Sequence, residues 1–301
     1  MILLSLLGEQ PIPNLLPLWQ DRRYTATQFA ATRATLDLAS QLARFISRDP
    51  QLSRLAVLEP LSLPPYDIAG ARAVLAGRLA ECQQAGQPVT LNLTGGTKVM
   101  SLAALQAAFG SGVPLLYVST EENRLITLGS DGAERASEPI QVRITVEQYL
   151  RAHGLEVSDT PNFGRREVRA RATVGDPLEQ RVFQAARKAG VFDDVRRQVF
   201  IRRFTERGPV VNELDVLVTR NGRLAVCSCK SGRAVSKEAL YELASLSRRE
   251  SAGIYCGKLL VSDQPELPSA IRDRARASGI HLVYGPELPN VASHLRLATD
   301  R

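Results

Sequence analysis

Residues 211–231 read VNELDVLVTRNGRLAVCSCKS, two apolar runs that are joined by Asn221-Gly222. An Asn-Gly pair between apolar runs favours a type I′ turn, because both central residues of that turn have positive φ. The stretch therefore predicts a β-hairpin. A two-residue loop also fixes the register of the two strands, so we expect Asp215 to lie opposite Ser228.

One face of the predicted hairpin is polar. Successive side chains of a strand point to opposite sides of the sheet, and directly opposed side chains have Cβ atoms roughly 4.5–5.5 Å apart. The register therefore gathers two carboxylates, a hydroxyl and an amine on one face, from Glu213, Asp215, Ser228 and Lys230. The other face carries Leu214, Val216, Cys227 and Cys229. From this stretch alone, a candidate site and a half-buried sheet with one solvated face are equally good interpretations.

The composition is that of a globular protein with more than one domain. A chain of 301 residues with 44% hydrophobic and 23% charged residues is long enough for two cores. The run Ile2–Leu7 is too short for a signal peptide or a membrane span, so we expect it to be a buried first strand. The four cysteines lack the spacing of zinc ligands. We therefore expect a reduced, cytoplasmic protein with no membrane partner.

The positive charge of the chain lies in its second half. Residues 151–301 contain 26 Lys and Arg against 18 Asp and Glu, whereas residues 1–150 contain 12 against 13. A basic half can attract a polyanion such as a nucleic acid. An arginine-rich surface without a partner would not explain why the excess lies in one half. We therefore predict different roles for the two halves, with nucleic acid binding in the second.

The first half alternates between strands and helices, which is typical of a doubly wound parallel sheet. The predicted strands are Ile2–Leu7, Arg54–Glu59, Pro88–Leu93 and Pro114–Ser119, and the predicted helices are Thr25–Ser47, Asp67–Ala85 and Val99–Phe109. A closing hairpin is expected from Leu125–Leu128 and Ile140–Ile144, followed by a short exit helix at Val146–His153.

Two loops follow strands at the sheet edge where doubly wound folds bind ligands. They are Gly8–Asn14 and Thr94–Lys98, the second with the sequence TGGTK. Its two glycines let the backbone approach a ligand, and the helix that follows presents N–H groups at its N-terminus. The lysine and the threonine hydroxyls add donors. The spacing is not that of a Walker A loop, and TGGTK by itself fits either phosphate binding or a plain glycine turn.

Together the two loops resemble those of the CARF family (CRISPR-associated Rossmann fold), over roughly residues 1–150. The specific parts are GEQPIPN after the first strand and TGGTK after a later one. The resemblance implies a Rossmann-like domain that dimerises and binds a cyclic oligoadenylate, expected to be cyclic tetra-adenylate, across the two-fold axis. A symmetric ring suits an isologous dimer. The implied ligand contacts are Gln10, Pro11, Ile12, Thr94, Gly95, Gly96, Thr97 and Lys98.

The second half predicts an α/β domain with a mixed sheet around the hairpin. Val157–Val174 is polar and basic and is interpreted as a linker. A helix is expected to begin at Asp176-Pro177, because proline suits the first helical position. Glu179 can complete a capping box with Asp176, or it can point to the polar face of the hairpin. Further predicted elements are the strands Val195–Arg203, Gly257–Ser262 and Ile280–Tyr284, and the helices Ser236–Arg249 and Pro268–Ser278.

The second half resembles the PD-(D/E)xK nuclease fold. It shares the order of that fold, which is a helix with a glutamate, then a hairpin with ELD and CSCK, then a second helix. A CARF-like domain at 1–155 and this restriction-endonuclease-like α/β domain at 156–301 make the whole chain similar to the small CARF effector nucleases of type III CRISPR systems. The resemblance implies catalytic roles for Glu179, Asp215 and Lys230. It also implies a Mg²⁺ or Mn²⁺ ion bound by Asp215 and Glu179, with Glu213 as a further candidate ligand.

Residue 228 departs from the family pattern, because Ser228 stands where the family has a glutamate. A hydroxyl is a poorer ligand for a hard cation than a carboxylate. Three accounts are open. The domain is inactive, natively or through an engineered change; or Glu213 supplies the second carboxylate; or a carboxylate has moved to the following helix, where Glu238 and Glu242 lie one turn apart.

The sequence is compatible with three functions. In the first, a homodimer is a cyclic-oligoadenylate-activated, metal-dependent endonuclease that cleaves DNA and/or RNA in antiviral defence. In the alternative, the same sensor carries a degenerate nuclease domain that binds nucleic acid or a partner without cutting. The third, in which the sensor domain degrades its own ligand, lacks a visible catalytic constellation in the sequence.

Overall fold

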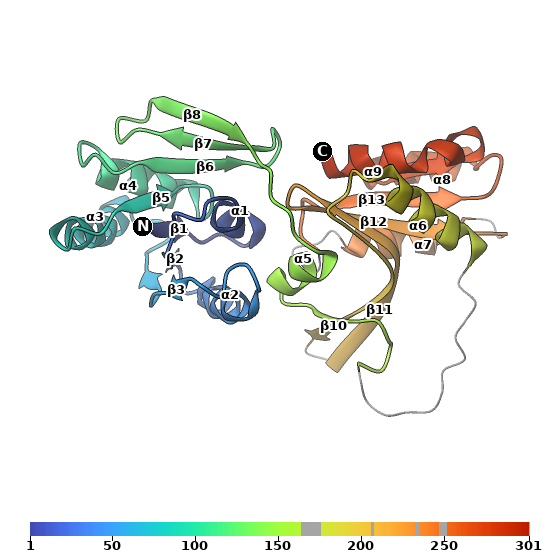
Figure 1. Ribbon diagram of the computed structural model, residues 1–301, viewed down its shortest axis with the longest axis horizontal. Coiled ribbons are helices and arrows are strands. Elements are labelled where there is room, and N and C mark those ends of the chain that lie inside the picture. The colour runs from blue at the N-terminus through green and yellow to red at the C-terminus, as the bar shows by residue number, and fades with distance from the viewer. Residues whose placement is uncertain (164–175, 206–207, 233–234, 247–251, 301) are drawn as a thin grey trace. The chain divides into compact units, whose positions relative to one another are not determined.

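The computed structural model describes residues 1–163, 176–205, 208–232, 235–246 and 252–300 (Figure 1). Two compact units make up the chain, Met1–Val142 and Arg143–Arg301. Each unit has its own sheet and its own core. The two units are described separately below.

The sheet of the first unit has eight strands in the order β3-β2-β1-β5-β6-β7-β8, with β4 paired to β2. All strands from β3 to β6 are parallel, and β7 and β8 close the sheet as an antiparallel edge. The doubly wound sheet expected from the sequence is therefore confirmed. The strands are β1 (Ile2–Leu6), β2 (Ala26–Ala31), β3 (Ala56–Val57), β4 (Leu61–Ser62), β5 (Val89–Asn92), β6 (Leu115–Ser119), β7 (Arg124–Leu128) and β8 (Glu134–Pro139).

Helices pack against this sheet through apolar side chains. Leu4 and Leu6 of β1 lie in one buried cluster with Leu75 and Met100, which come from two successive helices. The helices of the first unit are α1 (Ile12–Gln20), α2 (Leu36–Arg48), α3 (Ile68–Gln84) and α4 (Lys98–Ala108). Asp67 caps α3 by accepting a hydrogen bond from the Gly70 N–H at 3.0 Å, as its N-cap position predicts.

The helix predicted over 25–47 is wrong in its first part. Ala26–Ala31 forms β2, which pairs in parallel with β1, and α2 begins only at Leu36. All six residues of β2 are buried. A central strand that is covered on both faces shows no polar alternation, so its sequence ATQFAA could be joined to the helical pattern that follows it. The second strand of the closing hairpin was also misplaced, because β7 pairs with Glu134–Pro139.

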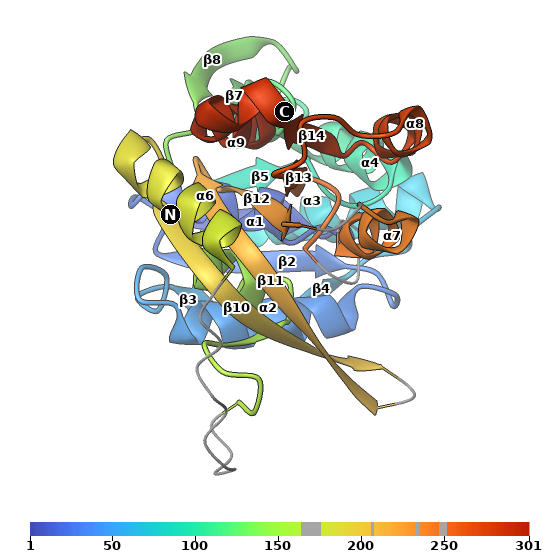
Figure 2. The same cartoon turned by 90° about the vertical axis from the view of Figure 1, so that its right-hand side faces the viewer.

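The sheet of the second unit has six strands in the order β14-β13-β12-β11-β10-β9. The strands β9, β10, β11 and β12 pair with one another in antiparallel fashion, whereas β12 pairs in parallel with β13 and β13 with β14, so the expected mixed sheet is confirmed. Figure 2 shows β10 and β11 as a long twisted ribbon that extends beyond the other strands. The strands are β9 (Glu156–Ser158), β10 (Asp194–Thr205), β11 (Gly208–Arg220), β12 (Arg223–Lys230), β13 (Gly257–Ser262) and β14 (His281–Tyr284).

The helices of the second unit cover both faces of this sheet. Leu178 and Val182 of the first long helix pack with Val216 and Cys227 of the hairpin. The helices are α5 (Val146–Ala152), α6 (Pro177–Ala189), α7 (Lys237–Leu246), α8 (Ser269–Ala277), the 3₁₀ turn η1 (Gly285–Asn290) and α9 (Val291–Asp300). Much of the predicted linker, residues 164–175, and the end of the helix predicted to reach Arg249 lie outside the described residues.

Helix α5 makes its hydrogen bonds within the second unit. The Val146 N–H donates to Asp194 at 2.9 Å, and the Tyr149 hydroxyl donates to the Ala252 carbonyl at 3.0 Å. The sequence predicts this helix at the end of the first domain, whereas in the structure it lies in the second unit, Arg143–Arg301. In the described parts of the chain, no helix is both long and apolar enough to cross a membrane.

The turn between β11 and β12 gives a stability prediction. Gly222 has φ 75°, a left-handed conformation in which a Cβ atom is strained. Gly222→Ala is expected to lower the free energy of unfolding by about 1 kcal/mol or more. Chemical denaturation followed by circular dichroism will measure it.

The control for the Gly222→Ala substitution is Gly77→Ala. Gly77 is exposed within α3, and a Cβ atom there meets no other atom within 4 Å. Alanine is favoured over glycine in a helix by roughly 0.5–1 kcal/mol. Equal effects of the two substitutions would contradict the role assigned to the turn.

Candidate functional site

The β11–β12 hairpin has the turn and the register that its sequence predicts. Asn221 and Gly222 both have positive φ, at 50° and 75°. The strand pairs run from Arg220 opposite Arg223 to Val216 opposite Cys227. One step further along, the Ser228 hydroxyl donates to the Asp215 carboxylate at 3.2 Å, as expected for residues that lie across from each other.

The carboxylate of Asp215 sits where the strand pairing ends. Its Oδ2 atom accepts the backbone N–H of Cys229 at 2.7 Å, so a side chain takes the place of a ladder hydrogen bond. Within the described hairpin, the recorded pairs stop at Val216–Cys227, and Glu213 and Lys230 are not paired as strand partners. Beyond this point β11 pairs with β10, while β12 pairs with β13.

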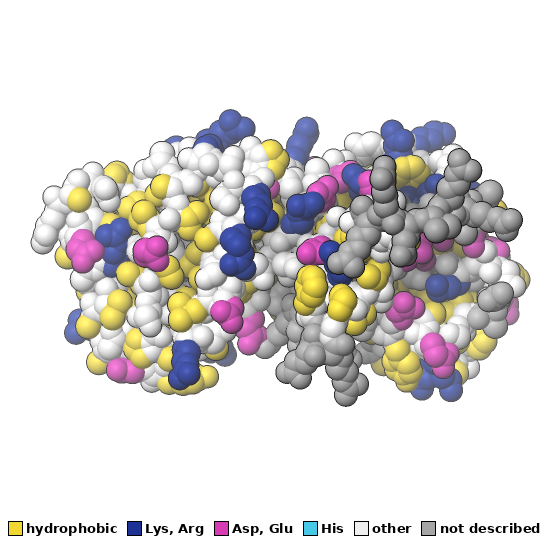
Figure 3. Space-filling view, turned by 90° about the horizontal axis from the view of Figure 1, so that it is seen from below, with side chains coloured by type: hydrophobic (Ala, Val, Ile, Leu, Met, Phe, Trp, Pro, Cys, Tyr) yellow, Lys and Arg dark blue, Asp and Glu magenta, His cyan; other side chains and the backbone are white. Residues whose placement is uncertain are grey.

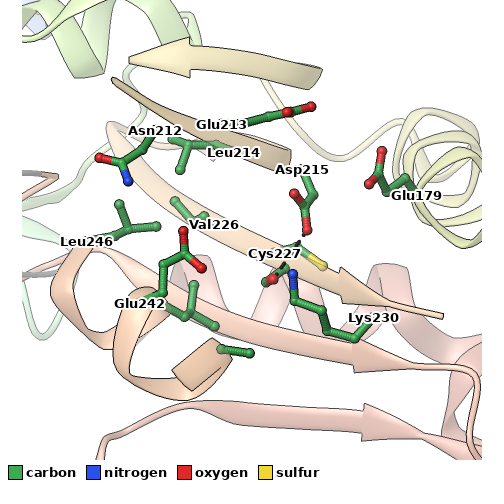
Figure 4. A pocket seen from close by; sticks show the side chains of 13 residues that line it. Glu179, Asn212, Glu213, Leu214, Asp215, Val226, Cys227, Lys230, Glu242 and Leu246 are labelled. Carbon is green, nitrogen blue, oxygen red and sulfur yellow. Dashed lines mark hydrogen bonds between the residues drawn. The ribbon is translucent and has the colours of Figure 1, made fainter. Parts of the chain in front are cut away.

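A cavity of about 270 Å³ opens at the place where the strands diverge (Figure 4). Four carboxylates line it, together with the ammonium group of Lys230, which extends toward Asp215 in Figure 4. The complete lining is Glu179, Asn212, Glu213, Leu214, Asp215, Val226, Cys227, Ser228, Lys230, Ala239, Glu242, Leu243 and Leu246. The structure thus brings together the five residues that the sequence predicts for this site, namely Glu179, Glu213, Asp215, Ser228 and Lys230.

Glu179 is placed by the start of α6. Asp176 is the N-cap and accepts the N–H of Leu178 at 2.8 Å, and Pro177 follows it at the first helical position. This arrangement puts Glu179 in the first turn, on the side of the hairpin. Its Oε2 atom is buried and has no hydrogen-bond partner in the described part of the chain. A buried carboxylate oxygen without a donor is costly unless a proton or a cation satisfies it.

Burial and neighbouring charges raise the pKa values of three acids that line the cavity. Burial, and after it the charges of Asp215, Asp176 and Glu213, raise the pKa of Glu179 to about 7. Burial and the Asp215 charge raise the pKa of Glu213. Burial also raises the pKa of Asp215, although the Cys229 N–H, Lys230 and Ser228 act in the opposite direction. An acidic cluster of this kind favours a bound cation.

The donor set of the cavity fits a hard divalent cation. Mg²⁺ and Mn²⁺ are bound in proteins by carboxylate oxygens and water, and the cavity offers Asp215, Glu179, Glu213 and Glu242. Within the described residues, no group of three or more Asp, Glu, His or Cys side chains is gathered closely enough to hold an ion. A few carboxylates completed by water and substrate oxygens is the usual form of a Mg²⁺ site.

The structure separates the two glutamates of α7. Glu242 lines the cavity, and Figure 4 shows its carboxylate extending into it. Glu238, one turn earlier, is not among the lining residues. Of the helix pair that was considered as a replacement for the carboxylate missing at Ser228, only Glu242 is in position.

One residue beside the cavity and one that lines it were not predicted from the sequence. Asp176 was interpreted only as a helix cap, but its second carboxylate oxygen also accepts a hydrogen bond from Ser231, and its charge contributes to the raised pKa of Glu179. Its place three residues before Glu179 was the available signal. Asn212 lines the cavity from the strand face opposite to Asp215, and no sequence pattern pointed to it.

The second candidate site lies in the first unit, where the loops after β1 and β5 meet. A Cβ atom on Gly95 would lie 2.0 Å from the Leu6 carbonyl oxygen, and one on Gly8 would lie 3.0 Å from the Gly96 nitrogen. The two loops therefore pack backbone against backbone at the carboxyl ends of neighbouring parallel strands. Only glycine permits this approach.

The structure divides the predicted ligand contacts of these loops into two groups. Pro11 and Ile12 are buried, and Ile12 begins α1, so their side chains pack inside the unit. The Thr94 hydroxyl donates to Asn92 at 2.6 Å, and the Thr97 hydroxyl donates to the Pro65 carbonyl at 2.7 Å. Both threonine hydroxyls thus hold the loop together.

The groups that face solvent at this edge are Gly96, Lys98 and the start of α4. The first N–H groups of a helix have no acceptor within the helix and attract anions. Basic and acidic side chains are interspersed over the visible face of the first unit (Figure 3). Oriented backbone donors and one lysine make this edge a candidate anion site.

Both units match known families. Residues 2–149 match the family described as Card1 CARF domain, and residues 166–300 match the Card1-like endonuclease domain. No curated protein sequence matches the chain.

Three solved structures share the fold of the chain. Protein VC1899 from Vibrio cholerae has a TM-score of 0.79 with 16% identity, covering 100% of this chain and 99% of its own. Can2 from Sulfobacillus thermosulfidooxidans, solved in complex with cyclic tetra-adenylate, has a TM-score of 0.79 with 18% identity, covering 100% and 97%. A type III CRISPR defence DNA nuclease activated by cyclic oligoadenylate has a TM-score of 0.59 with 18% identity, covering 94% of this chain and 48% of its own.

The raised pKa of Glu179 gives a pH prediction. The folded state holds the Glu179 proton up to a pKa of about 7, compared with 4.5 for the ordinary side chain. The folded state therefore binds more protons than the unfolded state between these values, and stability is lost as the pH rises from about 4.5 to 7. Glu179→Gln is expected to flatten this loss, as measured by chemical denaturation at pH 5 and pH 8.

A direct check is the titration of the Glu179 carboxyl carbon by NMR, in wild type and in Asp215→Asn. Removing the Asp215 charge should lower the pKa of Glu179, because that charge is one of its causes. A Glu179 that titrates at its ordinary pKa in the wild type would contradict the buried, clustered site.

Proposed function

We propose that the chain is a metal-dependent nuclease activated by cyclic oligoadenylate, because residues 2–149 match the Card1 CARF domain and residues 166–300 match the Card1-like endonuclease domain. The fold that it shares with Can2, which binds cyclic tetra-adenylate, makes this ring the first ligand to test. The proposed unit is a homodimer, because a two-fold symmetric ring needs matching surfaces from two protomers. The proposed substrate is DNA and/or RNA.

One observation carries the nuclease proposal: Glu179, Asp215 and Lys230 line the same cavity although they come from three different elements. The hydrogen bonds from Ser228 and Cys229 fix the Asp215 carboxylate in place. The Lys230 ammonium lies in the same cavity and can hold the attacking water or a phosphate oxygen. A carboxylate cluster beside a lysine is the arrangement that phosphodiester hydrolysis needs.

A divalent cation would be held by Asp215 and Glu179 together with water and substrate oxygens, and Glu242 lines the same cavity as the candidate for a further carboxylate ligand. When bound, Mg²⁺ or Mn²⁺ lowers the pKa of a water molecule and neutralises charge on the phosphate. Without a cation, the acids of the cavity would repel the phosphate backbone of a substrate. The orphaned Oε2 atom of Glu179 is the atom that such a cation would satisfy.

We choose Glu242 over Glu213 as the replacement for the glutamate missing at position 228. Glu242 extends into the cavity from α7, whereas Glu213 points along β11 away from Lys230 (Figure 4). Ser228 itself donates to Asp215 and therefore orients a ligand instead of acting as one.

Ser228 also supports the second candidate function, a sensor with a degenerate nuclease domain that binds nucleic acid without cutting. The family's own pattern places a carboxylate there. A cavity with one carboxylate fewer would bind a divalent cation more weakly.

In the first unit, the phosphates of the ring would lie against the Gly95–Lys98 backbone and the N-terminus of α4. Activation requires that the ligand binds the active arrangement of the dimer more tightly than the resting one.

Cleavage assays separate the two functions. Single- and double-stranded nucleic acid substrates are incubated with Mn²⁺, cyclic tetra-adenylate and one of four proteins. These are the wild type, Asp215→Ala, Glu242→Gln and Ser228→Glu. Asp215→Ala and Glu242→Gln are each expected to lose about 100-fold or more in rate, because metal stabilisation of the transition state is worth several kcal/mol. An inert wild type with an active Ser228→Glu would establish the degenerate sensor, and activity that persists in Asp215→Ala would rule out this cavity.

Binding of Mn²⁺ alone tests the third carboxylate without relying on activity. Isothermal titration calorimetry is expected to show weaker binding for Glu242→Gln than for wild type, by about tenfold or more. The matched control is Glu238→Gln, one turn away on the same helix and outside the cavity. Equal affinities for both variants would remove Glu242 from the site and leave Glu213 as the candidate.

A further inference from the structure

Tyr66 is the most exposed aromatic side chain of the first unit, which the structure describes throughout. Its side chain is 80% accessible to solvent, compared with 71% for Phe109 and 45% for Tyr117. The remaining aromatic residues of this unit, Trp19, Tyr24, Phe29 and Phe45, are buried. An aromatic ring that the protein leaves in water is available to a ligand or a partner.

The loop that carries Tyr66 lies at the same sheet edge as the two glycine loops. It connects β4 to α3 and has the sequence LPPYD over 63–67. Strand β4 pairs in parallel with the carboxyl end of β2, at Ala31 opposite Ser62. Because β2, β1 and β5 are parallel neighbours, the loops after all of these strands meet at one edge.

Hydrogen bonds tie the Tyr66 loop directly to TGGTK. The Thr97 hydroxyl donates to the carbonyl of Pro65 at 2.7 Å, and the same hydroxyl accepts the Met100 N–H at 3.1 Å as the cap of α4. One hydroxyl thus joins the residue before Tyr66 to the helix N-terminus that is proposed to bind phosphate.

The loop is held on both sides of Tyr66. Leu63 is buried in the core cluster, and Asp67 caps α3 through the Gly70 N–H. Two consecutive prolines, Pro64 and Pro65, restrict the backbone between Leu63 and Tyr66. The backbone of Tyr66 is therefore fixed while its ring is free, which lowers the entropic cost of binding to it.

We propose that Tyr66 is the base-stacking residue of the sensor site, with a purine base of the ligand lying on its ring while the adjacent phosphate contacts Gly95–Lys98. This inference rests on the proposed function. A nucleotide ligand brings one flat apolar face for each phosphate, and aromatic side chains are the usual platform for such a face. In a two-fold dimer, the two Tyr66 rings would take two bases of the cyclic ring.

Calorimetric titration of the full-length protein with cyclic tetra-adenylate tests the proposal. Tyr66→Ala is expected to weaken binding by roughly tenfold or more, from the typical strength of base–aromatic stacking. Tyr66→Phe keeps the ring and should bind as wild type does. Phe109→Ala is the matched control, because Phe109 is also exposed but follows the opposite end of α4.

A fluorescent cyclic oligoadenylate gives a signal that would not change if Tyr66 had only a structural role. In a cyclic tetra-adenylate with one 2-aminopurine, stacking on Tyr66 should quench the base, and Tyr66→Ala should relieve the quenching. Wild-type affinity in Tyr66→Ala would overturn the inference while leaving the sensor function intact. Failure of the wild type to bind any cyclic oligoadenylate would remove both. A Tyr66→Ala protein that dissociates into monomers by light scattering would assign the ring to protomer contact and overturn the stacking role.

Discussion

The carboxylate of Asp215 stands at the one position of β11 where the strand is unpaired on both sides. Toward β12, the recorded pairs end at Val216–Cys227, and the carboxylate itself accepts the next N–H, that of Cys229. Toward β10, the pairs pass from Arg197–Val216 to Val199–Leu214, and Gln198 between them has φ 52°. The divergence of the strands creates the cavity, and the same hydrogen bond that replaces the ladder fixes the charge inside it.

The rest of the second unit supplies what this charge needs. Helix α6 brings Glu179 and helix α7 brings Glu242, each against the diverging strands. The apolar cluster of Leu178, Val182, Val216 and Cys227 holds α6 on the sheet. The same hairpin therefore contributes to both the polar cavity and the apolar core of the second unit.

A structural feature could be predicted from the sequence where a few adjacent residues determine it. The hairpin register followed from Asn221-Gly222, and the cap of α6 followed from Asp176-Pro177, because two or three adjacent residues decide each of them. Strand β2 was missed since a strand buried on both faces lacks alternation. The choice of Glu242 over Glu238 and the position of Tyr66 at the ligand edge depend on packing between distant segments, which no local pattern records.

The interrupted ladder also has a consequence for how this protein changes over generations. Residue 228 lies just past the last strand pair between β11 and β12, and its side chain is directed to the cavity and not to the core. A change between glutamate and serine at this position alters the chemistry of the cavity and leaves the folding of the sheet to other residues. Substitutions at residue 228 can therefore accumulate over generations without disturbing the sheet that surrounds the cavity.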